Sequence, residues 1–425
     1  MERTTLQQDG KRKRKGMAID YPGRLFAAAF ILFLFCSFIA SAAEGIGNIH
    51  FGSLEIHPFL NVTEGFVDNP YLARKGYEKT SGYRSYVPGV RCDWQKTKYR
   101  FQLSYLFEIF RYDIRDVDDK DLFDLDSAFD TQFGKSGHGL FVDGGYRYRK
   151  TSDPPTTEDR AENRRETDAR LGVRLNMRDR FGIALNAGLV EHRYEDSSVA
   201  DDRNRDVLTL TSKATLRPFT KTAILLEYGY TASDYCDPVQ AVRSDSTTQS
   251  VLTGLEWEAT AKLSGAIKGG YQWKEYNDAS GTGDRMPETW KVAVDLKQTF
   301  SEFTSLTLAM ERRIEDSTFL YAGREAEFYY SSMGRLGLDH QLTYKIGTWI
   351  DLSYTYSDYR NVPRKDEMYE CRAGLDYQFL EWIWGTINGS MRQRNTNISE
   401  QDTLDSPDTY DYRTYQVNIG LNLVF

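Results

Sequence analysis

The chain ends in residues 415–425, which read YQVNIGLNLVF. Every second position of this stretch carries an apolar side chain, and polar or small residues stand between them. Strict alternation has the period of a β-strand that turns one face to apolar and the other to polar surroundings. The stretch therefore predicts an amphipathic strand, whose apolar series is Tyr415, Val417, Ile419, Leu421, Leu423 and Phe425.

The same period recurs along the chain after residue 43. We count about 18 alternating segments, within a range of roughly 16–20, and each boundary carries an error of about two to four residues. No apolar run beyond residue 43 approaches the roughly 20 residues of a membrane-spanning helix. The segments lie near residues 52–62, 84–95, 98–112, 122–134, 138–149, 165–177, 180–192, 206–217, 221–232, 247–259, 261–274, 288–300, 303–315, 326–342, 346–358, 367–379, 382–393 and 410–425.

The connections between these segments alternate in length. Short turns of a few residues are followed by long loops rich in Asp, Arg, Ser, Thr and Gly. Short periplasmic turns and long outer loops are the connectivity of a transmembrane β-barrel. The sequence therefore predicts an all-β, antiparallel, up-and-down barrel, with long loops over residues 64–83, 150–164, 193–205, 233–246, 275–287 and 394–409.

Aromatic residues gather at both ends of the predicted strands. Amphipathic rings prefer the headgroup level, so a barrel in lipid needs one aromatic girdle at each interface. We expect the outer girdle to contain Tyr86, Tyr146, Tyr148, Tyr228, Tyr230, Tyr271, Trp273, Trp290, Tyr354, Tyr356 and Tyr369. We expect the periplasmic girdle to contain Trp94, Tyr99, Phe181, Trp257, Phe300, Trp349, Phe379 and Trp382.

Charged residues occupy the polar phase of the alternation. A charge on the lipid face costs about 2–4 kcal/mol near the midplane, so we expect these side chains to line the lumen. Two interpretations stay open. The mixed signs suit a neutral or weakly charged solute such as a sugar chain, or the charges only pair across strands and hold the wall in shape. The candidates are Arg91, Asp93, Arg100, Glu108, Arg170, Arg174, Lys213, Glu227, Glu256, Lys268, Asp295, Glu311, Arg313, Arg335, Asp339, Asp351, Arg372 and Asp376.

Sugar chains commonly slide along rows of stacked aromatic rings. No single segment in the polar phase carries such a row, so the sequence predicts no aromatic trail in the lumen.

The first 43 residues differ from the rest. A basic cluster at residues 11–15 precedes an apolar run over residues 25–39 and a small-residue stretch at residues 40–43. This order is typical of a secretory signal peptide with its cleavage site. We therefore expect residues 1–43 to be a signal peptide and residues 44–425 to be the exported barrel.

Charge and motifs exclude several functional classes. The 425 residues include 54 Lys and Arg against 62 Asp and Glu, whereas a nucleic-acid binder would carry a basic footprint. We find no P-loop, GxGxxG, GxSxG or HExxH motif, and only five histidines. An aspartate-rich run over residues 113–126 lacks the glycine and glutamate of an EF-hand, so we expect a solvated loop. We predict no enzyme activity, no catalytic residues, no cofactor and no metal site.

Two stretches resemble known proteins. Residues 415–425 resemble the C-terminal signal of bacterial outer-membrane proteins, a strand ending in Phe that the barrel-assembly machinery reads. Residues 54–60 and 64–72, LEIHPFL and EGFVDNPYL, resemble the opening of the β-barrel porin family whose genes often accompany exopolysaccharide synthesis. That family has a similar apolar-x-Pro strand and an aromatic-Thr-Asp-Asn step, where this chain has Val67 in place of the Thr.

The resemblance implies an outer-membrane channel for a secreted polysaccharide. Such barrels are thought to work beside a periplasmic polysaccharide-export protein. No catalytic residues come with the family. The opening motif contains Pro58, Asp68 and Asn69, of which Asp68 and Asn69 are expected to be structural, capping the first strand and turning the first outer loop. Two rival functions stay open, a general or solute-specific uptake porin and a non-conducting surface scaffold or adhesin.

Overall fold

The structure of the protein is a computed structural model. The structure describes residues 49–73, 78–114, 119–135, 138–153, 162–177, 180–195, 203–236, 245–257, 262–277, 286–317, 320–321, 324–325, 328–360, 362–397 and 411–425. No helix within these ranges is long and apolar enough to span a membrane. The signal peptide expected over residues 1–43 lies outside the described residues.

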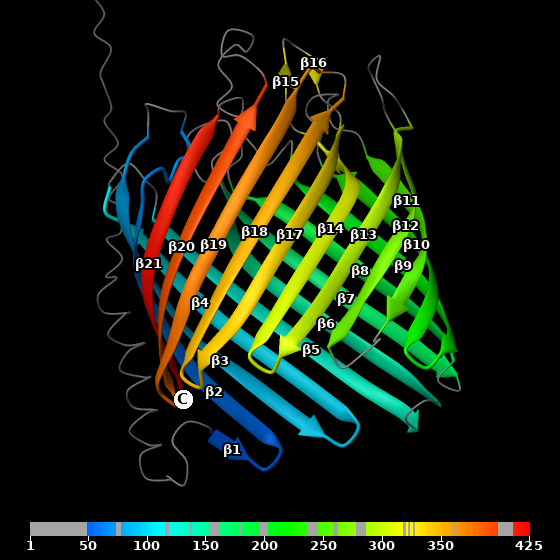
Figure 1. Ribbon diagram of the computed structural model, residues 1–425, viewed down its shortest axis with the longest axis horizontal. Coiled ribbons are helices and arrows are strands. Elements are labelled where there is room, and N and C mark those ends of the chain that lie inside the picture. Colours follow the sequence, from blue (N-terminus) through cyan, green and yellow to red (C-terminus); the bar gives the residue numbers. More distant parts are fainter. Residues whose placement is uncertain are drawn as a thin grey trace, which may run out of the picture. The chain divides into compact units, whose positions relative to one another are not determined.

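The alternating segments form a single antiparallel sheet that closes on itself (Figure 1). The sheet has 19 strands, of which the short β1 (Ile49–Phe51) pairs only with β2, so 18 strands form the barrel. They are β2 (Leu54–Val67), β3 (Ser81–Lys96), β4 (Tyr99–Tyr112), β5 (Lys120–Lys135), β6 (His138–Asp153), β7 (Glu162–Met177), β8 (Phe181–Tyr194), β9 (Arg205–Phe219), β10 (Thr222–Tyr235), β11 (Ser246–Trp257), β12 (Leu263–Tyr276), β13 (Glu288–Ser301), β14 (Thr304–Asp316), β17 (Phe328–Thr343), β18 (Ile346–Tyr359), β19 (Lys365–Leu380), β20 (Ile383–Thr396) and β21 (Tyr412–Val424).

Each barrel strand pairs with its sequence neighbours, and β2 pairs with β21 to close the ring. In Figure 1 the strands of the near wall, β13 to β21, cross those of the far wall, β4 to β8, as tilted strands in a barrel do. Closure leaves none of these 18 barrel strands as a sheet edge, which is the condition for a sheet to survive in lipid. The predicted barrel of about 18 strands is confirmed.

Strand ends differ from the prediction in several places. The strand β2 continues to Val67, and β5 begins at Lys120, so the expected loop over residues 113–126 is partly strand. Asp124 lies inside β5 and is ion-paired with Arg147 of β6. A small hairpin of β15 (Leu320–Tyr321) and β16 (Arg324–Glu325) was also not predicted. These differences arise because polar residues extend a strand once its partners supply backbone hydrogen bonds.

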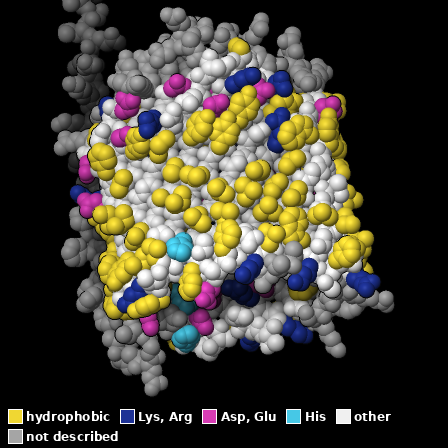
Figure 2. All heavy atoms as spheres, viewed as in Figure 1, with side chains coloured by type: hydrophobic (Ala, Val, Ile, Leu, Met, Phe, Trp, Pro, Cys, Tyr) yellow, Lys and Arg dark blue, Asp and Glu magenta, His cyan; other side chains and the backbone are white. Residues whose placement is uncertain are grey.

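The apolar phase of the strands forms the outer surface. Leu226, Ile387 and Ile419 are 55%, 52% and 63% exposed, far more than a water-soluble protein would leave for such side chains. Figure 2 shows a band of hydrophobic side chains around the middle of the visible face, with charged side chains gathered toward its two ends. This is the apolar band that a barrel presents to lipid.

The C-terminal strand follows the same rule. In β21 the residues Tyr415, Val417, Ile419 and Leu421 are all exposed on this apolar face. The backbone N–H of Phe425 donates to the carbonyl of Pro58 on β2 at 2.8 Å. Because proline lacks an N–H but keeps its carbonyl, Pro58 still accepts a bond from the last residue of the chain.

The girdles are as expected at most positions but not at Trp349. Tyr86, Tyr146, Trp290 and Phe379 lie in the apolar phase and are exposed. Trp349 pairs with Asp339 and Gly374 in the polar phase, so its indole lies on the inner face, and its assignment to the periplasmic girdle is wrong. A Cβ added to Gly374 would lie 2.5 Å from this indole. The absent side chain of Gly374 therefore makes room for the ring inside the barrel.

Candidate functional site

The charged candidates from the sequence all lie in the polar phase of their strands. Their side chains therefore occupy the inner face of the sheet, opposite the exposed apolar band. Register places them beside one another across strands, as in the pairing of Asp351 with Arg372 and of Lys213 with Glu227. The candidate site is thus an extended wall to which most strands contribute.

The most continuous part of this wall is a ladder of five alternating charges on β17 to β20. Arg335 Nε donates to Asp351 Oδ2 at 2.6 Å, and Arg372 Nη2 donates to Asp351 Oδ1 at 3.3 Å. Arg392 Nη2 donates to Glu370 Oε1 at 3.2 Å, and Arg372 Nε lies 3.7 Å from the same oxygen. Three arginines and two carboxylates leave this ladder with one net positive charge.

Two further pairs reach across an intervening strand. Lys213 on β9 bonds to Glu256 on β11 over β10, whose Leu225 is 1% exposed. Lys268 on β12 donates to Glu227 on β10 at 3.1 Å over β11. These lysine side chains therefore cover Leu225 and Leu252, two buried apolar residues that lie on the otherwise polar inner face.

Other candidates form ion pairs within a single strand or contact uncharged residues. Arg91 Nε donates to Asp93 at 3.0 Å, Arg170 Nε lies 3.3 Å from Asp168, and Arg313 Nη1 donates to Glu311 at 3.1 Å. Three candidates make other contacts: Glu108 accepts from Ser85, Arg174 lies over the ring of Phe141, and Asp339 accepts from Ser305. Within the described residues, no ion pair is formed by Arg100, Arg174, Asp295 or Asp376.

Charge along the wall is layered. The side chain of Arg335 is 52% exposed while that of its partner Asp351 is 11% exposed. Likewise Arg170 is 56% exposed and Asp168 19%. The carboxylates at these pairs lie against the wall, and the guanidinium groups stand in front of them. A solute passing here would meet N–H donors first.

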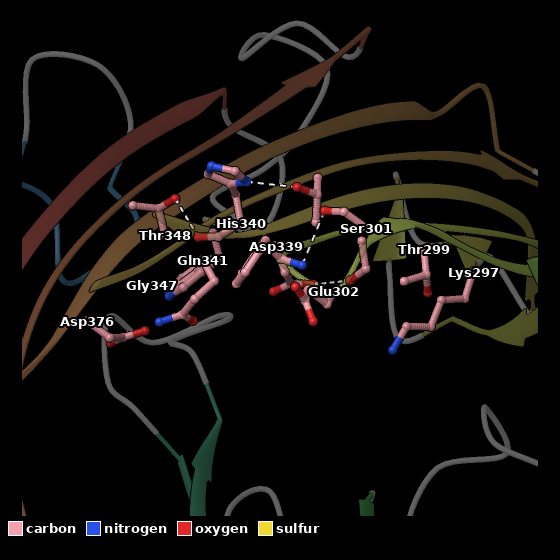
Figure 3. A pocket seen from close by; sticks show the side chains of 14 residues that line it. Lys297, Thr299, Ser301, Glu302, Asp339, His340, Gln341, Gly347, Thr348 and Asp376 are labelled. Carbon is pink, nitrogen blue, oxygen red and sulfur yellow. Dashed lines mark hydrogen bonds between the residues drawn. The ribbon is translucent and has the colours of Figure 1, made fainter. Parts of the chain in front are cut away.

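A polar cavity of about 380 Å³ lies at the short-turn end of β13, β14, β17, β18 and β19 (Figure 3). Asp376 and Lys297 lie on opposite sides of it, with Gln341 between them. Asp339 and the inward Trp349 complete this part of the lining. The cavity brings together two of the predicted candidates, Asp339 and Asp376, and offers a carboxylate-rich recess at the periplasmic end.

Stacked aromatic rings on the inner face were missed by the sequence analysis. The rings of Tyr83 and Phe110 are stacked with their centroids 4.9 Å apart, and the ring of Tyr112 is tilted by 56° against Phe110 with a centroid distance of 4.8 Å. A second stack joins Tyr329 and Tyr359 at 4.8 Å. The stacked pairs Tyr83–Phe110 and Tyr329–Tyr359 each join neighbouring strands, and a search within single segments does not find such pairs. The sequence did contain a signal, because Phe110 and Tyr112 follow Glu108 at every second position and therefore share its inner face.

The opening motif joins the first strand to the last. The backbone N–H of Asp68 donates to the carbonyl of Tyr415 at 3.1 Å, and Asp68 Oδ1 accepts from the N–H of Tyr415 at 2.6 Å. Asn69 Nδ2 donates to the carbonyls of Ala73 and Arg413 at 2.8 and 3.2 Å, and its Oδ1 accepts from the N–H of Ala73 at 2.8 Å. The pair therefore extends the seam between β2 and β21 and turns the first outer loop.

Replacement of Asn69 by alanine is expected to lower the free energy of unfolding by about 1–3 kcal/mol. Asn69 is fully buried, and its removal leaves backbone groups of Ala73 and Arg413 without their partner. Urea unfolding in lipid vesicles measures the loss. Asn61→Ala is the matched control, because Asn61 lies on the same seam opposite Asn422. Equal losses for the two variants would contradict a special role of Asn69.

Among the described residues, no group of three or more His, Cys, Asp or Glu side chains is arranged to hold a metal ion.

Several solved structures are similar to this chain at low sequence identity. The FrpB iron transporter from Neisseria meningitidis (F5-1 variant) is 9% identical, with 87% of this chain and 82% of that chain covered and a TM-score of 0.45. The copper transporter OprC is 12% identical, with 89% and 82% covered and a TM-score of 0.47. A bacterial polysaccharide outer membrane secretin is 9% identical, with 87% and 98% covered and a TM-score of 0.37.

A search of curated proteins gives no significant match. The family model described as "Putative beta-barrel porin 2", in contrast, matches residues 43–407, which is most of the chain. The protein is therefore a barrel of the bacterial outer membrane and belongs to the "Putative beta-barrel porin 2" family.

Proposed function

We propose that this porin-like barrel provides the outer-membrane path for an exported polysaccharide. The observation that carries the proposal is the polar, charge-paired inner face of a closed barrel of this size. Barrels of about 16–18 strands leave an aqueous lumen, whereas smaller ones fill with side chains. Ion pairs such as Arg335–Asp351 fix the long charged side chains in place along the wall of such a lumen.

Two features favour a glycan as the solute. The ring of Phe110, which stacks on Tyr83, and the stacked rings of Tyr329 and Tyr359 offer flat apolar surfaces on the inner face, which suit the C–H faces of sugar rings. The resemblance of residues 54–72 to porins found beside exopolysaccharide synthesis points the same way. The energy for export comes from synthesis and inner-membrane steps, since a passive channel supplies none.

The proposal includes the maturation of the chain and its partners. Residues 1–43 act as a cleaved signal peptide, and the barrel-assembly machinery recognises the strand that ends at Phe425. A periplasmic polysaccharide-export protein delivers the glycan to the short-turn end of the barrel. No catalytic step is required of any residue.

Cysteine accessibility tests the lumen directly. In a chain whose Cys92, Cys236 and Cys371 are replaced by serine, Ser353→Cys places a thiol on the inner face and Leu352→Cys one on the outer face. A charged thiol reagent is expected to lower the planar-bilayer conductance of the Ser353→Cys channel and to leave the Leu352→Cys channel unchanged. Absence of conductance from a correctly folded barrel would contradict an open path and favour the scaffold function.

Export is tested in the native bacterium. Deletion of the gene is expected to leave polysaccharide in the periplasm, and the wild-type gene should restore it to the cell surface. Unchanged surface polysaccharide in the deletion strain would overturn export. Loss of cell adhesion with intact export would instead indicate the adhesin function.

One observation favours an uptake porin as the second candidate. Asn69, Pro70 and Leu72 line the same cavity as inner-face residues of β3, β4 and β19, so these residues of the first outer loop border the inner face. Constricting loops are suited to selecting small solutes. Rapid flux of mono- and disaccharides into liposomes that contain the barrel, with no block of that flux by long glycans, would favour uptake over export.

A further inference from the structure

A second cavity of about 410 Å³ lies at the outer end of the closing seam. Its wall includes Asn69 and Leu72 from the first outer loop, Gln416 from β21, and Ser390 from β20. The volume falls within the roughly 300–1,000 Å³ of small-molecule sites. The cavity is therefore large enough to hold a sugar unit of a passing chain.

One side of this cavity is aromatic. Tyr83, Phe110 and Tyr112 all line it and contact one another at centroid distances of 4.8–6.4 Å. Tyr83 is 3% exposed and accepts a hydrogen bond from Gln416, so it is held beneath the other two rings. Phe110 thereby presents a supported apolar face against which a pyranose ring can pack, and the ring of Tyr112 stands beside it at 56°.

The other side is cationic. Arg372 and Arg392 line the cavity, and Glu370 is the one carboxylate among the described lining residues. The side chains of Arg372 and Arg392 are 41% and 36% exposed, while Glu370 is 18% exposed and lies behind them. Each arginine directs one Nη2 group to a carboxylate of the ladder, which leaves further N–H donors of both forks available to an anion.

Polar groups between these two sides complete the site. Ser390, Thr414 and Gln416 line the same cavity, and Thr414 Oγ1 has no hydrogen-bond partner within the described residues. The Nε atoms of Arg372 and Arg392 are likewise without a hydrogen bond there. The polar side of the cavity therefore contains buried hydrogen-bonding groups that contacts within the wall do not satisfy.

We infer that this cavity is a subsite for an acidic sugar, a pyranose bearing a carboxylate, within the exported chain. The ring packs on Phe110 beside Tyr112, and its carboxylate accepts hydrogen bonds from Arg372 and Arg392. A planar guanidinium matches a carboxylate in charge and geometry. The inference rests on the proposed function in so far as the sugar belongs to the transported glycan, and it makes that glycan acidic.

Calorimetric titration of the mature protein, purified from outer membranes in detergent, tests the subsite. Trigalacturonate is the acidic probe and maltotriose is the neutral probe. Trigalacturonate is expected to bind at least about tenfold more tightly, because it alone forms charge-assisted hydrogen bonds with the arginines. Equal binding of the two probes would overturn the inference, and competition by equimolar sodium sulfate as strong as by galacturonate would reduce the site to a general anion site.

Variants locate the binding. The double variant R372Q/R392Q is expected to weaken trigalacturonate binding by about tenfold or more, and Tyr112→Leu to weaken both probes. Arg335→Gln is the matched control, because Arg335 belongs to the same ladder but does not line the cavity. Its affinity should stay within about twofold of wild type. Equal losses for R335Q and R372Q/R392Q would show long-range attraction instead of a subsite.

Folding and transport are scored separately. Heat-modifiable migration on gels confirms that each variant is a folded barrel, and if R372Q/R392Q does not fold, Tyr112→Leu decides the location. If the protein conducts but does not bind trigalacturonate, the inferred subsite is overturned and the proposed path is not. If the protein binds trigalacturonate but neither conducts nor supports export, the proposed path is overturned and the subsite is not.

Discussion

Replacement of Leu226 by arginine is expected to lower the free energy of unfolding in lipid by about 2–4 kcal/mol. Leu226 is 55% exposed on the apolar face of β10, between Ala214 of β9 and Thr253 of β11. A guanidinium there has no partner in hydrocarbon. Urea unfolding of the barrel in lipid vesicles, followed by tryptophan fluorescence, measures the change.

The matched control places the same charge on the other side of the wall. Thr211 of β9 lies on the inner face opposite Gly229, where the added side chain finds space and polar neighbours. Thr211→Arg is therefore expected to change stability by less than about 1 kcal/mol. If the two variants were equally stable, the assignment of inner and outer faces on β9 and β10 would be wrong.

Replacement of Asp351 by alanine is expected to cost about 2 kcal/mol of stability and to shift the channel toward anions. Asp351 is bonded to both Arg335 and Arg372, so its loss leaves two cations without their shared partner. Breaking a buried ion pair costs roughly 3–5 kcal/mol, and the half-exposed guanidinium groups reduce this figure. Unfolding in lipid measures stability, and reversal potentials in a salt gradient measure selectivity.

Asp339→Ala is the control for this variant. Asp339 lies on the same face, where its one hydrogen bond among the described residues is a 3.5 Å contact from Ser305. Its loss should change stability by about 0.5 kcal/mol or less. The importance of the ladder would be contradicted if both variants had the same stability while both shifted selectivity equally.

The strand plan could be read from the sequence because its signal is local. Alternation in a stretch such as residues 415–425 has the period of two that only a strand with two different faces requires. The count of strands followed from repetition of that pattern, and the inner position of Asp351 or Arg372 followed from phase alone. None of these conclusions needs knowledge of which strands touch.

The features that were missed depend on contacts between strands. The stack of Tyr83 on Phe110 and the ladder through Asp351 and Glu370 exist only because of a particular register between neighbours. Trp349 was misplaced because its position near a strand end was given more weight than its phase, which is that of Asp351. The place of Asn69 at the border of the inner face depends on a loop conformation, for which no periodic signal exists.

Closure of the barrel has a kinetic consequence. The hydrogen bond from Asn69 to Arg413 joins residues separated by 344 positions. Bringing such distant points of a flexible chain together costs about 5 kcal/mol in loop entropy, plus a constant, if nothing between them is ordered. Successive hairpins between β2 and β21 remove most of that cost by shortening the remaining gap. The seam is therefore expected to be the last contact formed, and the bonds of Asp68 and Asn69 fasten the ring once every strand is in place.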